Sequence, residues 1–135
     1  MATSGDKLLI QKEEILRKFK NEAIYNEFHV LRSNVSVKKY IDNSKYVGEV
    51  FNQVRHGRGI YYYSNGAVYH GHWKQDKFHG KGVYIFPNGE RYDGEVRDGF
   101  RNGNGVYYYK NGNIYSGEWR KDKKNGFGKF EHKDL

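Results

Sequence analysis

A repeat of 23 residues constrains this chain more than any other feature of its sequence. Tyrosine recurs at that spacing, and a glycine follows two residues after each of Tyr46, Tyr69, Tyr92 and Tyr115. Each unit also carries a Gly-x-Gly pair, such as Gly57 and Gly59, and three units close on Asn-Gly. Because 15 of the 17 glycines fall in these columns, we interpret the chain as a tandem array.

Each unit is predicted to form one β-hairpin. Asn-Gly between apolar runs is a strong signal for a short hairpin turn, because both residues tolerate positive φ. We expect the second turn of each unit to be longer and place it at residues 53–56, 76–79, 99–102 and 122–125. The strands of unit two would then cover 69–74 and 80–86. Four such units predict about eight strands in one antiparallel meander.

Glycine and aromatic residues are predicted to share one face of this sheet. Alternation along a strand places Tyr69, Gly71 and Trp73 on the same side. The chain has 13 tyrosines and few aliphatic residues, so its core must be built from rings. We infer that the glycines leave slots into which neighbouring rings pack, each good pair adding roughly 0.5–1.5 kcal/mol beyond the buried area.

The opposite face mixes a column of Glu49, Glu95 and Glu118 with apolar residues such as Ile60 and Val83. A single sheet with apolar side chains on both faces needs a cover. We expect either the N-terminal segment or a partner protein to supply it.

The N-terminal region, residues 1–45, differs from the repeats. Apolar residues recur near every 3.6 positions over 6–32, which predicts an amphipathic helix. Residues 33–45 are polar and read as a linker with a short extended piece at 35–37. The helix could cover the sheet or its first edge, or it could dock on another protein. The repeats are placed at 46–68, 69–91, 92–114 and 115–135.

The composition indicates the compartment of the protein and excludes some kinds of structure. The chain has no cysteine, which excludes disulfides and thiolate metal sites and favours a reducing, cytoplasmic location. No secretory signal and no apolar run of membrane-spanning length are present, so no transmembrane segment is expected.

No constellation of catalytic residues is visible, and an array of equivalent units argues against a single asymmetric active site. His70 and His72 share one face of a strand but lack a third metal ligand, and the Gly-x-Gly pairs lie in strands rather than before a helix as a phosphate loop requires. We therefore predict no enzyme, no metal, no cofactor and no nucleic-acid partner.

Basic residues gather near the second turn of units two to four. The net charge is +8, which favours an acidic partner, although a solvated edge that discourages strand pairing is the simpler interpretation. This basic edge comprises Lys74, Lys77, Lys81, Arg97, Arg101, Arg120, Lys121, Lys123 and Lys124.

The sequence pattern resembles the MORN repeat (membrane occupation and recognition nexus). The run Tyr-Ser-Gly-Glu-Trp at 115–119, followed by Gly-Phe-Gly at 126–128, carries the resemblance most fully. Units one and three depart from it, with Val50 and Val96 in the place of the large aromatic residue, and unit four ends early after Phe130. The resemblance implies an elongated, twisted single-layer sheet with an aromatic groove. Such arrays serve as scaffolds in ciliary and other cytoskeletal complexes, and lipid binding was the family's first proposed role.

These observations give two hypotheses. The first is a non-catalytic scaffold subunit of a large cytoskeletal assembly, namely a ciliary axoneme, with tubulin or other axonemal proteins as partners. Its partner-binding groove would consist of Tyr61, Tyr63, Trp73, Tyr84, Phe86, Tyr107, Tyr109 and Trp119. The second is a peripheral membrane protein that binds anionic phospholipids through the basic edge.

Overall fold

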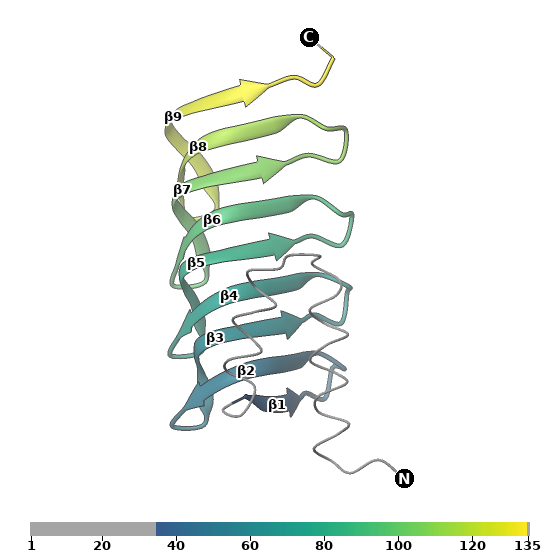
Figure 1. Ribbon diagram of the computed structural model, residues 1–135, viewed down its shortest axis with the longest axis vertical. Coiled ribbons are helices and arrows are strands. Elements are labelled where there is room, and N and C mark those ends of the chain that lie inside the picture. Colours follow the sequence, from purple (N-terminus) through teal and green to yellow (C-terminus); the bar gives the residue numbers. More distant parts are fainter. Residues whose placement is uncertain (1–34, 135) are drawn as a thin grey trace.

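The computed structural model describes residues 35–134, which form one open antiparallel sheet of nine strands in chain order. The mainly β class and the meander are therefore confirmed, whereas the helix predicted over 6–32 lies outside the described residues. Figure 1 shows the strands stacked along the long axis of the molecule. Their bounds are Ser36–Lys39 (β1), Lys45–Phe51 (β2), Val54–Tyr62 (β3), Val68–Lys74 (β4), Lys77–Ile85 (β5), Arg91–Arg97 (β6), Phe100–Tyr108 (β7), Ile114–Arg120 (β8) and Lys123–Glu131 (β9).

Strand β1 adds one strand to the eight that the repeats predict. The extended piece expected at 35–37 continues to Lys39 and pairs with β2, with Ser36 opposite Gly48 and Lys39 opposite Lys45. The first strand of unit one is therefore an inner strand among the described residues.

The prediction for the two kinds of turn was wrong, because the turn expected to be longer has only two residues between paired strands. It consists of Asn52-Gln53 in unit one, and both residues have positive φ, as a type I′ turn requires. The same holds for the pairs at 75–76, 98–99 and 121–122. Only Gly99 of these eight residues is glycine, and Asp98-Gly99 is the one pair of the usual type I′ composition among them.

The Asn-Gly loops are longer than the other turns. In each of them the asparagine side chain accepts a backbone N–H two residues further on. In the first loop, the N–H of Gly66 donates to the carbonyl of Tyr63, and the N–H of Tyr63 donates to the carbonyl of Ala67. The side chain of Asn65 accepts the N–H of Ala67 at 3.0 Å. Only Gly66 of the pair has positive φ. This is the three-residue hairpin loop in which glycine takes the left-handed position.

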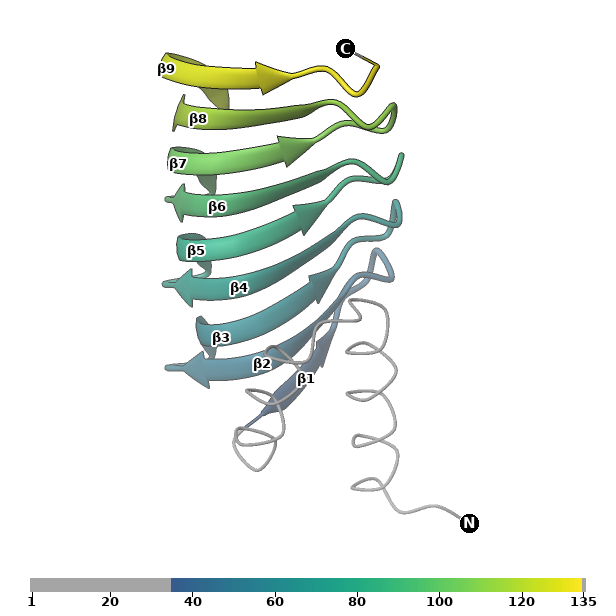
Figure 2. The ribbon, with the colours of Figure 1, turned by 45° about the horizontal axis from the view of Figure 1, so that its top comes forward.

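A β-bulge in each unit explains the glutamate column. The register shifts after Gly48, so that residues 56–58 face Glu49 alone. Gly57 has a φ of 81°, and a side chain there would collide with the Glu49 carboxylate. That carboxylate accepts the backbone N–H of Arg58 at 2.5 Å. Bulges bend strands, and Figure 2 shows the resulting curvature of the sheet.

The predicted packing of rings into glycine slots is confirmed. The repeat tyrosines Tyr46, Tyr69 and Tyr92 have no solvent-exposed surface, and each ring lies over two paired glycines of its own unit. The hydroxyl of Tyr69 donates to the carbonyl of His72 at 2.8 Å. Burial raises the pKa of the Tyr69 hydroxyl, which keeps this donor protonated.

The opposite face carries a smaller apolar cluster at its N-terminal end, formed by Val35, Val47, Ile60 and Val68. Ile60 is fully buried, whereas its repeat equivalents Val83 and Val106 are only partly buried. The two faces therefore differ along the array: the aromatic core continues through all four units, and the aliphatic cluster does not.

Candidate functional site

All eight residues predicted for the groove lie on one face of the sheet, in or against a single aromatic core, but they divide into two groups. Trp73, Trp119 and Tyr107 are buried. The other five are half-buried, namely Tyr61, Tyr63, Tyr84, Phe86 and Tyr109. Only this second group offers substantial surface to a partner.

Each of the two tryptophans packs between the repeat tyrosines of two neighbouring units. Trp73 lies edge-on between Tyr46 of the preceding unit and Tyr69 of its own, with ring centroids 5.4 and 5.1 Å away. Its indole N–H donates to the carbonyl of Gly59 at 3.2 Å. Trp119 repeats this arrangement between Tyr92 and Tyr115. These residues are therefore part of the core rather than of an open contact surface.

The half-buried rings form a continuous line together with the buried ring of Tyr107 and the exposed ring of Phe130, and we call this line the aromatic row. Successive ring centroids lie 4.5 to 5.7 Å apart over residues Tyr40, Tyr61, Tyr63, Tyr84, Phe86, Tyr107, Tyr109 and Phe130. Tyr40 and Phe130 were missed at the level of sequence. Phe130 falls in the same 23-residue column as Tyr107, so the periodicity could have identified it.

Units one and three each contain an arginine that makes the same set of contacts with the unit that follows. Arg101 forms an ion pair with Asp122, with its Nε 3.1 Å from Oδ1, and its guanidinium lies 4.7 Å from the centroid of Trp119. Arg55 makes the same ion pair with Asp76 and lies 4.8 Å from the centroid of Trp73. The structural repeat is thus two units long. Arg101, which was predicted to belong to the basic edge, instead faces the aromatic core.

The ion pair of Asp76 predicts a pH dependence of stability. Burial raises the pKa of the Asp76 carboxyl, but the hydrogen bonds from Arg55 outweigh that effect, so this pKa lies below its usual value. A lowered pKa in the folded state stabilises the fold above the ordinary carboxyl pKa, and the stabilisation is lost as the pH falls through the folded value.

We expect Asp76→Asn to lower the free energy of unfolding at neutral pH by about 0.5–1 kcal/mol, a small effect because the side chain is half exposed and solvent screens it. Denaturant unfolding at neutral and strongly acid pH checks this, and the difference from wild type should vanish in acid. Asp98→Asn, at an exposed turn, is the control. An equal effect of both substitutions would contradict the assignment.

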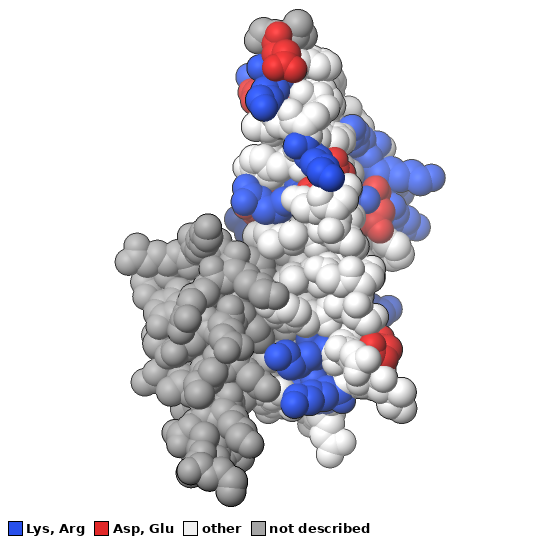
Figure 3. Space-filling model, turned by 90° about the vertical axis from the view of Figure 1, so that its right-hand side faces the viewer, with Lys and Arg blue, Asp and Glu red and all other residues white. Residues whose placement is uncertain are grey.

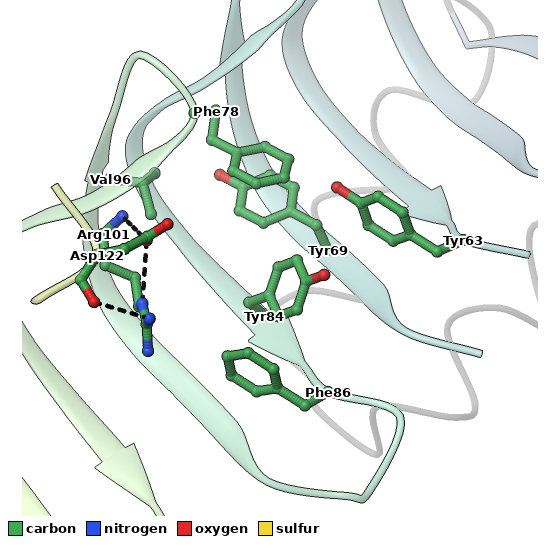
Figure 4. Close-up of a pocket in the computed structure, with 9 residues that line it drawn as sticks. Tyr63, Tyr69, Phe78, Tyr84, Phe86, Val96, Arg101 and Asp122 are labelled. Carbon is green, nitrogen blue, oxygen red and sulfur yellow. Dashed lines mark hydrogen bonds and ion pairs between the residues drawn. The ribbon is translucent and has the colours of Figure 1, made fainter. Parts of the chain in front are cut away.

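A pocket of about 210 Å³ opens at the centre of the aromatic face, between units two and three. In Figure 4, Phe78 stacks on Tyr69 on one side, and Arg101 with Asp122 forms the other side. The rings of Tyr63, Tyr84 and Phe86 complete the wall. Three of the five half-buried groove residues thus line this hollow.

The basic residues do not form one continuous surface. Eight of the nine are exposed, and Lys74, Lys81 and Arg97 line one shallow depression together with Glu95. Arg101 is partly buried in its ion pair, and Lys124 contacts rings of the aromatic row. On the side that Figure 3 presents, basic groups are scattered with acidic ones beside several of them.

Within residues 35–134, no group of three or more His, Asp or Glu side chains could hold a metal ion. The described part of the chain also contains no helix that is long and apolar enough to cross a membrane.

The fold defines a single-layer β-hairpin repeat protein whose units are bound together by rings, glycines and inter-unit ion pairs. A family model for the MORN repeat matches residues 46–68, 69–91, 92–114 and 115–134. The chain belongs to the MORN-repeat family. This family is generally non-catalytic, and its repeats indicate a protein-interaction or membrane-associated role. A search of curated proteins found no match to the chain.

Proposed function

We propose that this chain is a non-catalytic scaffold subunit that holds a segment of a partner protein along the aromatic row. The observation that carries the proposal is the unbroken line of rings from Tyr61 to Tyr109, half-buried except for Tyr107, with a hollow at its centre. Aromatic side chains that are partly exposed and rigidly held are the residues on which protein interfaces most often depend.

The partner in this proposal belongs to a large cytoskeletal assembly in the cytoplasm, namely a ciliary axoneme. The net charge of +8 supports an acidic partner surface, because complementary charge speeds association and selects between partners. Tubulin presents such a surface, which makes it the first candidate.

Co-sedimentation with stabilised microtubules tests this proposal. The double variant Tyr84→Ser with Phe86→Ser removes two rings from the row and should weaken binding by roughly tenfold or more. The matched control is Val83→Ser with Ile85→Ser, which changes neighbouring residues that point to the opposite face of the sheet. Equal binding of wild type and the ring variant would contradict the groove. Absence of the tagged protein from the cilia of ciliated cells would contradict the location.

A peripheral membrane role is the second candidate, and the depression lined by Lys74, Lys81 and Arg97 favours it. Each basic residue near an anionic membrane surface contributes about 1 kcal/mol. Flotation with phosphatidylserine vesicles at low and high salt separates the two functions. Salt-resistant flotation that is lost when these three residues are changed to glutamate would overturn the protein-binding proposal.

A further inference from the structure

The central pocket lies at the one junction between repeats from which the alternating tryptophan is missing. Trp73 fills the junction between Tyr46 and Tyr69, and Trp119 fills the junction two units further on. Between Tyr69 and Tyr92 the equivalent residue is Val96. Valine and tryptophan alternate in this repeat column, so Val96 lies two units, or 46 residues, after Val50. The smaller side chain leaves space that an indole occupies elsewhere in the same molecule.

Phe78 fills only part of that space. Its ring stacks on Tyr69 with the centroids 3.9 Å apart, and the remaining pocket still measures about 210 Å³. A liquid water molecule takes roughly 30 Å³, so the hollow is of the size of a side chain rather than of a single bound water.

We propose that this pocket receives an aromatic side chain, preferably tryptophan, from an acidic segment of a partner protein. The proposal rests on the proposed protein-binding function and specifies its partner. An aromatic ring is expected because the protein fills the equivalent position at both neighbouring junctions with an indole of its own, that of Trp73 or Trp119. Those indoles donate to the carbonyls of Gly59 and Gly105, and Gly82 holds the equivalent repeat position in unit two.

The walls of the pocket suit a planar ring with electron-rich faces. The guanidinium of Arg101 lies 5.6 Å from the centroid of Phe86 and 4.7 Å from that of Trp119, so it already packs against aromatic rings. A ring in the pocket would lie beside this guanidinium and against the ring of Tyr84, which combines cation–π and aromatic contacts.

The charge next to the pocket indicates that the partner segment is acidic. Lys124 occupies the repeat position of Arg101, but no carboxylate among residues 35–134 pairs with it; its ammonium lies 2.5 Å from the Tyr109 hydroxyl and 4.7 Å from the centroid of Tyr115. Two strand spacings, about 10 Å, separate β7 from β9, and an extended peptide covers that distance in about three residues. The segment should therefore carry a carboxylate about three residues from its aromatic side chain.

Short synthetic peptides test both parts of the proposal by NMR titration of the full chain. The probe is acetyl-Trp-Ser-Ser-Glu-amide, and the comparison peptides replace Trp by Ala or Glu by Gln. We expect saturable amide shifts at Val96, Gly99 and Arg101 with the probe and none with the Ala peptide. The Glu peptide should bind roughly two- to five-fold more tightly than the Gln peptide, as for an exposed ion pair.

Variants of the protein locate the two contacts. Val96→Trp fills the pocket from within and should abolish the shifts, whereas the control Val106→Trp, on the opposite face of β7, should leave them. Lys124→Gln should remove the preference for the Glu peptide, whereas Lys123→Gln should not. Because the Lys124 comparison and the peptide series do not need Val96→Trp, they decide the matter even if that variant fails to fold.

Shifts that are absent with the probe, or that persist in Val96→Trp, would overturn the pocket assignment. Equal binding of the Glu and Gln peptides would overturn the acidic partner. If Val96→Trp still binds microtubules while the Tyr84→Ser and Phe86→Ser variant does not, this inference fails and the proposed function stands.

Discussion

Replacing Gly105 by alanine is expected to lower the free energy of unfolding by about 3 kcal/mol, at the upper end of the cost of overpacking a core. The new methyl group would collide with the ring and hydroxyl of Tyr92. That ring cannot move aside, because it is fully buried and its hydroxyl donates to the carbonyl of Glu95 at 2.5 Å. Urea unfolding followed by far-UV circular dichroism measures the change.

Gly89→Ala is the matched control for this prediction. Gly89 lies in an Asn-Gly loop with no atom near the added methyl group, but its φ is 92°. Its replacement should cost only the about 1–2 kcal/mol of a left-handed conformation. A larger loss for Gly89→Ala than for Gly105→Ala would contradict the view that the strand glycines serve as slots for rings.

A double-mutant cycle identifies the ring as the cause. Tyr92→Ala alone should cost about 3–5 kcal/mol, as for other large-to-small changes in a core. Adding Gly105→Ala to Tyr92→Ala should cost much less than in the wild type, because the colliding ring is gone. A coupling of about 0.5–3 kcal/mol is typical of residues in contact. Additive losses would show that the methyl group acts on the backbone instead.

The sequence predicts the packing of this fold well because the packing is periodic. Tyr69, Gly71 and Gly82 recur in every unit, so alternation and spacing alone place ring and slot on the same face. The short turns escaped prediction because three of the four contain no glycine, and only Asp98-Gly99 carries the usual residue pair of a two-residue hairpin turn.

The candidate site was harder to predict than the fold because it depends on departures from the repeat. Arg55, Phe78, Arg101 and Lys124 share one column, and only three-dimensional packing shows that all four contact rings of the aromatic face. The pocket lies where unit three has Val96 in place of the tryptophan of units two and four. In the sequence this valine indicates only a poorer match to the repeat. Its meaning appears only when Trp73 and Trp119 are seen to fill the neighbouring junctions.

Trp119→Ala is expected to cost about 3–5 kcal/mol, with the loss concentrated at the junction between units three and four. In a repeat protein the stability is approximately the sum of unit terms and junction terms. Trp119 provides much of one such junction, since its ring contacts Tyr92 and Tyr115 and its N–H donates to Gly105. Trp119→Phe keeps a ring but loses the donor, and it should cost distinctly less.

Hydrogen exchange shows where that loss falls. In Trp119→Ala the amides of β8 and β9 should exchange much faster, while those of β4 and β5 keep their protection, because Trp73 still closes the junction between units one and two. An equal acceleration in all strands would contradict a junction effect. The junction at Val96 has no tryptophan in the wild type, so we expect it to be the least stable of the three junctions between repeats. Occupying its pocket with an aromatic ring should therefore slow exchange on both sides of it, in β5 and β6 alike.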